Sequence, residues 1–110
     1  MKLPNREKAH IPREKILDYL LSPTHRDGKP KHDFFIRFGF TRERWEQLAN
    51  VLIQHAQSHD VQAFFETPFG YRYIIEGMIM CPDGRQPVIL SVWFIDASGN
   101  APRLVTAYPA

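Results

Sequence analysis

The first sixty residues carry apolar positions at helical spacing. Four aliphatic residues recur three or four positions apart shortly after Pro12, a residue type that suits the first turn of a helix. A second apolar stripe with the same spacing follows Thr41, a candidate N-cap. The pattern therefore predicts helices over about residues 12–21 and 41–58, with a short turn over residues 5–9.

After Asp60 the pattern changes to short runs rich in β-branched and aromatic residues. The predicted strands are 61–66, 71–81, 87–95 and 103–108. The segments between them are rich in Pro, Gly, Asp and Asn and are too short to hold crossover helices, which favours an antiparallel meander. An uncovered apolar sheet would expose a large patch, so the prediction is an α+β fold with two N-terminal helices packed on one face of a four-stranded antiparallel sheet.

The last predicted strand carries polar side chains that suit a binding surface. Strict alternation puts Leu104, Thr106 and Tyr108 on one face and Arg103, Val105 and Ala107 on the other, unless a bulge intervenes. Thr and Arg at these positions also have a structural explanation, because Thr favours strands and Arg103 follows a turn.

With 110 residues and 12.9 kDa, the chain forms one domain, residues 1–110. Its helical part with a basic loop covers about residues 1–60, and its sheet covers about residues 61–110. The longest apolar stretch is too short to cross a membrane, and the N-terminus lacks the apolar centre of a signal peptide, so we expect no membrane association and a cytoplasmic location. Cys81 is the only cysteine, which excludes an internal disulfide.

Basic residues are concentrated in the helical half. The net charge is only +2, but eleven of the fourteen Lys and Arg residues lie between Lys2 and Arg44, together with six of the twelve acidic residues. Such asymmetry suits a polyanion or an acidic protein partner, and it also suits an ordinary solvated helical surface.

The polar segment 22–32 is the first candidate for a catalytic or phosphate-binding site. As histidines, His25 and His32 can transfer protons, while Lys29 and Lys31 can hold a phosphate. The alternative is a solvated loop whose Gly and Pro residues only turn the chain.

Other candidate residues give weaker signals. His55 and His59 are four positions apart on the second predicted helix, but a third ligand is missing, so we expect no metal site. Cys81 has no histidine fixed nearby to activate it as a nucleophile. Trp93 is either a core residue or an exposed binding platform.

The order of several short motifs resembles a bacterial family of uncharacterised small domains associated with toxins. The motifs cover most of the chain: Tyr19-Leu20-Leu21, His25, Gly28-Lys29-Pro30-Lys31, Phe34-Phe35, Gly39-Phe40, Tyr71-Arg72-Tyr73, Gly84-Arg85, Trp93-Phe94-Ile95 and Pro102 to Pro109. Helices followed by four strands also resemble the ribonuclease fold of barnase, EndoU-type, colicin-type and RelE-type toxins. That resemblance implies an active site on the sheet face away from the helices and a reaction that needs no metal or cofactor.

The resemblance implies a metal-independent ribonuclease toxin, present in the cytoplasm or secreted as part of a larger toxin, with RNA and an acidic antitoxin or immunity protein as partners. The implied catalytic residues are His25 as proton carrier, Lys31 and Arg103 as phosphate-neutralising cations, and Thr106 as a hydrogen-bonding group. Further substrate-binding candidates are Lys29, Trp93, Tyr73 and Tyr108. A noncatalytic protein-binding or regulatory module on the same fold is the alternative function.

Overall fold

The helices precede the strands along the chain, which confirms the predicted α+β class. The computed structural model describes residues 1–110. Its helical elements are the 3₁₀ helix η1 (Arg6–Lys8), α1 (Arg13–Lys15), the π-helix η2 (Ile16–Leu20), α2 (Lys29–Arg37) and α3 (Trp45–Ser58). Its strands are β1 (Val61–Thr67), β2 (Gly70–Met78), β3 (Val88–Asp96) and β4 (Arg103–Pro109). None of the helices combines the length and the hydrophobicity that a membrane crossing requires.

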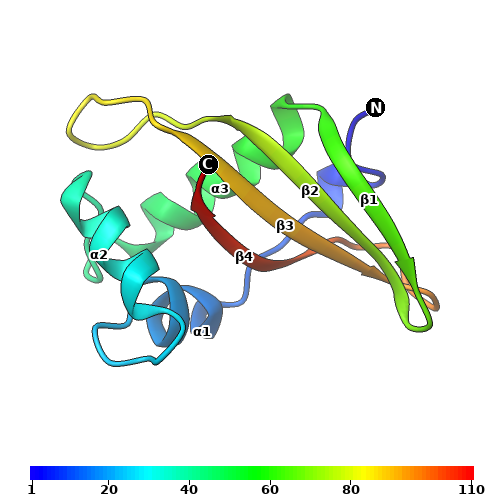
Figure 1. Ribbon diagram of the computed structural model, residues 1–110, viewed down its shortest axis with the longest axis horizontal. Helices are drawn as coiled ribbons and strands as arrows, with labels where there is room; N and C mark the ends of the chain where they lie inside the picture. Colours follow the sequence, from blue (N-terminus) through cyan, green and yellow to red (C-terminus); the bar gives the residue numbers. More distant parts are fainter.

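The four strands form one antiparallel sheet in the order β1-β2-β3-β4, as the short connections predict. Figure 1 shows α3 crossing behind the sheet, whereas α1 and α2 lie beyond β4. The face of the sheet opposite α3 carries no helix, and we call it the open face.

The core lies between α3 and the covered face of the sheet. The buried residues of α3 recur at the predicted helical spacing: Leu48, Ala49, Leu52, His55 and Ala56. The helix begins at Trp45 rather than at Thr41, because the Thr41 hydroxyl accepts the backbone N–H of Arg44 in a separate turn. The guanidinium of Arg42, in the same turn, donates to the carbonyls of Leu17 and Leu21.

The helical structure before α3 differs from the prediction in two further places. The first predicted helix is a single α-turn followed by η2, in which the Leu21 N–H reaches the Ile16 carbonyl at 2.7 Å. The segment predicted as a loop continues into an unpredicted helix, α2. Its Phe35 is completely buried, so this helix belongs to the core as well as to the polar surface.

A bulge in β4 decides which side chains reach the open face. Thr106 pairs with Val92, but Arg103 pairs with Phe94, so Val105 is an additional residue in the strand. Val92 and Phe94 alternate with the fully buried Trp93, which faces α3. Arg103 and Thr106 therefore lie on the same open face, although strict alternation would separate them.

A buried hydrogen-bond network joins α3 to the sheet. His55 is 2% exposed, and its Nε2–H donates to the Gly77 carbonyl at 3.1 Å while its Nδ1 accepts the Ser91 hydroxyl at 2.8 Å. The Ser91 oxygen accepts the indole N–H of Trp93 at 2.9 Å. Both ring nitrogens of His55 are used in this way, and burial lowers its pKa to about 4.

The depressed pKa of His55 predicts a loss of stability on acidification. The unfolded chain binds this proton near pH 6.5 and the folded chain only near pH 4, so the contribution is complete above pH 6.5 and decreases below it. We expect the free energy of unfolding to fall by about 1–2 kcal/mol between pH 6.5 and 5 because of this group. Urea denaturation across this range measures it.

His55→Gln should remove this part of the pH dependence, and His59→Gln, which leaves the Ser91 network in place, should retain it. If the wild-type stability is flat between pH 6.5 and 5, the prediction is wrong even if His55→Gln does not fold.

Candidate functional site

Tyr19 forms the centre of a polar cluster at the outer edge of β4. The π-helix η2 directs its hydroxyl toward β4, where it lies 2.9 Å from the Thr106 hydroxyl. Tyr19 lies between Ile16 and Leu20, which are buried in the core, and its own side chain is half-buried. It therefore connects the helical half of the chain to the last strand.

Two lysines lie over the Tyr19 ring. The Lys15 ammonium is 5.1 Å from the ring centroid and the Lys31 ammonium is 5.4 Å from it, both within the range of a cation–π interaction. Lys31 also donates to the Asp27 carbonyl at 3.1 Å. Neither ammonium forms an ion pair with a carboxylate, so both positive charges are available to an anion.

His25 packs edge-on against Tyr19, with ring centroids 5.1 Å apart and an interplanar angle of 81°. Its Nδ1 accepts the backbone N–H groups of Asp27 and Gly28, each at 3.0 Å. The Ser22 hydroxyl accepts the His25 N–H at 3.0 Å and fixes the start of this turn. Because Nδ1 is an acceptor here, the neutral ring carries its proton on Nε2 and presents an N–H donor.

Gly28 allows the His25 turn to lie directly on η2. A Cβ atom at this position would overlap the backbone carbonyl of Tyr19. Only glycine permits this close approach, so Gly28 brings His25 and Lys31 to the same tyrosine.

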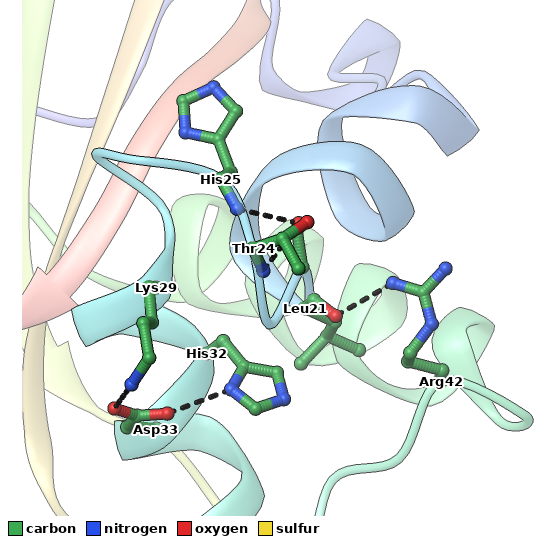
Figure 2. Close-up of polar contacts among 8 residues, drawn as sticks. Leu21, Thr24, His25, Lys29, His32, Asp33 and Arg42 are labelled. Carbon is green, nitrogen blue, oxygen red and sulfur yellow. Dashed lines mark hydrogen bonds and ion pairs between the residues drawn. The ribbon is translucent and has the colours of Figure 1, made fainter.

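Lys29 and His32 lie apart from this cluster. Both contact Asp33, with Lys29 Nζ at 2.8 Å and His32 Nδ1 at 2.9 Å. These two contacts lower the pKa of the Asp33 carboxyl. In Figure 2 the three side chains lie together on α2, away from the ring of His25.

Arg103 is the first residue of β4, and its side chain lies on the open face. Its guanidinium donates to Asp96 at 2.6 Å and lies 5.0 Å from the centroid of the Phe94 ring. Together with Lys15 it lines a pocket at that end of the sheet. The structure therefore brings His25, Lys31 and Thr106 together around Tyr19, and Arg103 lies in an adjoining pocket that Lys15 connects to them.

The aromatic candidates occupy three different environments. Trp93 is completely buried and is a core residue rather than an exposed platform. Tyr73 pairs with Trp93 on the covered face, is 7% exposed and stacks on Phe64. Tyr108 pairs with Leu90 and is half-buried on the open face.

The surroundings of His55 and Cys81 indicate structural roles rather than metal binding or nucleophilic chemistry. Both ring nitrogens of His55 are bonded within the core, which leaves neither free for a metal. Cys81 is buried, and this burial raises its pKa to about 11, with the nearby Asp83 carboxylate acting in the same direction. The thiol is therefore protonated at neutral pH.

Sequence reasoning did not identify Tyr19 and Lys15 as site residues. The available signal is their spacing: Lys15 and Tyr19 are four positions apart at the polar margin of an apolar stripe. A residue at that margin can pack against the core and present a polar tip to the surface.

The Tyr19–Thr106 contact predicts measurable coupling between two distant parts of the chain. Tyr19→Phe and Thr106→Val each remove one hydroxyl with little change in shape. We expect each to reduce stability, and a double-mutant cycle to give a coupling energy of about 0.5–1.5 kcal/mol. Chemical denaturation of the four proteins measures this energy, and strictly additive effects would contradict the contact.

Comparison with known proteins agrees with this fold. A chain of the contact-dependent growth inhibition toxin–immunity protein complex from Klebsiella pneumoniae 342 is similar in structure, with a TM-score of 0.74 and 21% sequence identity, over 91% of this chain and 98% of that chain. No protein with a curated description matches the sequence. Residues 2–110 match the family described as a domain of unknown function, DUF6883, and the chain belongs to this family.

Proposed function

We propose that the protein is a toxin domain that cleaves RNA without a metal ion and is held inactive by an acidic immunity protein. The observation that carries this proposal is the convergence of His25, Lys15, Lys31 and Thr106 on Tyr19, at the margin of the open face. Two unpaired ammonium groups, a fixed imidazole and two hydroxyls in one place suit a phosphodiester better than a neutral ligand.

The proposed reaction is attack of a ribose 2′-oxygen on the adjacent phosphorus. The bond to the 5′-oxygen breaks, water takes up the proton of the 2′-hydroxyl, and water supplies the proton that the leaving 5′-oxygen requires. Negative charge accumulates on the phosphoryl oxygens in the transition state, so Lys15 and Lys31 stabilise that state more than the ground state. The Tyr19 and Thr106 hydroxyls orient the phosphate by hydrogen bonds.

His25 acts in this proposal as a hydrogen-bond donor. Its Nδ1 faces two backbone N–H groups, so its outward-facing nitrogen is Nε2, which carries hydrogen in the neutral ring. This nitrogen is placed to donate a hydrogen bond to a phosphoryl oxygen or to the leaving 5′-oxygen as negative charge develops there. The residue inferred from the sequence resemblance as proton carrier is thus assigned a charge-stabilising role, because transfer of the Nε2 proton would leave an imidazolate.

An immunity partner is proposed from charge and from the structural neighbour. The similar chain was solved in a toxin–immunity protein complex. An acidic partner that covers Lys15 and Lys31 would block the two ammonium groups that bind the RNA phosphate in this proposal.

One observation favours a second function, a noncatalytic protein-binding module. β1 is an edge strand, and Phe64 and Phe65 on it are each 53% exposed. Exposed aromatic residues on a free edge suit the addition of a strand from another protein. Such a module would bind its partner through β1 and would cleave no RNA.

His25→Ala and Lys31→Ala should each lower RNA cleavage by the purified protein by roughly 100-fold or more, because each removes a group that acts in the transition state. Growth arrest on expression in a bacterium should be lost in parallel. His32→Ala and Lys29→Ala are the matched controls, since both residues contact Asp33 away from Tyr19, and they should retain most activity. Full activity of His25→Ala, with its fold verified by circular dichroism, would contradict the assignment.

Cleavage should also continue in excess EDTA, because the proposed charge stabilisation comes from lysines. The products should carry 2′,3′-cyclic phosphate and 5′-hydroxyl ends. Loss of activity in EDTA that returns with added Mg²⁺ or Zn²⁺ would show that a metal performs the chemistry.

A further inference from the structure

A pocket lies on the open face beside the turns that join β1 to β2 and β3 to β4. Its volume is about 460 Å³, within the range of small-molecule sites. The residues around it that carry the argument are Lys15, Phe69, Arg72, Phe94, Asp96 and Arg103. Lys15 also lies over Tyr19, so the pocket adjoins the proposed catalytic cluster.

Three of these residues form a row across the sheet. Arg72 in β2 pairs with Phe94 in β3, and Phe94 pairs with Arg103 in β4. Residues that pair in adjacent antiparallel strands project from the same face. The bulge at Val105 is the reason that Arg103 joins this row.

The basic side chains of the pocket differ in whether a carboxylate neutralises them. Arg103 is neutralised by Asp96 at 2.6 Å and covers the Phe94 ring. Lys15 and Arg72 form no ion pair with any carboxylate. An anion in the pocket is therefore attracted to the side of Lys15 and Arg72 and repelled from the side of Asp96.

Phe69 supplies an apolar surface at the rim. It is 76% exposed, more than any other large hydrophobic residue of the chain. Its turn is held in place, because the Thr67 hydroxyl accepts the N–H groups of Phe69 and Gly70, each at 3.1 Å, and the Phe69 carbonyl accepts the Ala97 N–H at 2.9 Å. An aromatic ring that is exposed to water on a fixed turn is a ready platform for a flat ligand.

We infer that this pocket binds one unpaired nucleotide of a single-stranded RNA, with its base against Phe69 and its phosphate between Lys15 and Arg72. The inference rests on the proposed function and names the subsite that holds the substrate beside the cleavage site. Arg103 and Thr106 pair with Phe94 and Val92, which are two positions apart on β3, so they lie about 7 Å apart along the sheet. A short extended piece of RNA reaches from the pocket to Tyr19 over this distance.

The test is binding of a fluorescein-labelled, single-stranded 2′-O-methyl RNA, which lacks the nucleophilic hydroxyl and cannot be cleaved by the proposed reaction. Fluorescence anisotropy at several salt concentrations gives its affinity. Phe69→Ala should weaken binding roughly 5- to 100-fold by removing the stacking surface. Arg72→Gln should weaken binding and lower the slope of log affinity against log salt by about 0.7, as expected for one lost phosphate contact on a single strand.

The matched controls lie away from the pocket. Phe64→Ala removes an exposed phenyl ring from the covered face, and Arg6→Gln removes an exposed guanidinium from η1. Both proteins should bind the probe as the wild type does.

Two outcomes overturn the inference in distinguishable ways. If the wild type cleaves unmodified RNA but Phe69→Ala and Arg72→Gln bind the probe like the wild type, the subsite is wrong and the proposed function stands. If the wild type neither binds nor cleaves RNA, both fail. In that case, loss of binding to an immunity protein in the same two variants would identify the pocket as a protein interface.

Discussion

The contact between Tyr19 and β4 is the interaction on which the rest of the site depends. The segment before α2 has too little apolar surface to fold alone, and it becomes ordered by packing Ile16, Leu20 and Leu21 into the core. Tyr19 lies in that segment and meets Thr106 in β4. Gly28 lies directly against the Tyr19 backbone, which holds the His25 turn beside the same tyrosine. Packing of this segment into the core therefore also places the polar groups.

Much of the fold follows from the sequence because it depends on periodicity. The strands and their order follow from alternating apolar runs and short turns, and α3 follows from its single apolar stripe. α2 was missed because its first turn, around Pro30, is strongly polar, and its apolar residues follow as an aromatic cluster. The single buried ring of Phe35 makes that helix part of the core, and burial of one ring is a tertiary property.

The site was predictable only in part. The residue types singled out the polar segment and the last strand, and the structure brings side chains from both to Tyr19. Which residues meet was not visible: Lys29 binds Asp33, whereas Lys31, two positions later, reaches Tyr19. The sequence left open whether a bulge would place Arg103 and Thr106 on one face, because a bulge depends on the pairing with the partner strand.

The bulge at Val105 makes the open face depend on how β4 pairs with β3 as well as on which residues β4 contains. Regular pairing without the bulge would leave both side chains in the chain while turning Arg103 toward the covered face. The sheet could then keep its hydrogen bonds, with Val105 in the place of Leu104 opposite Trp93, and still lose the row formed by Arg72, Phe94 and Arg103. A family with this architecture can thus diverge between a more and a less cationic open face by the gain or loss of one bulge, without any new side chain.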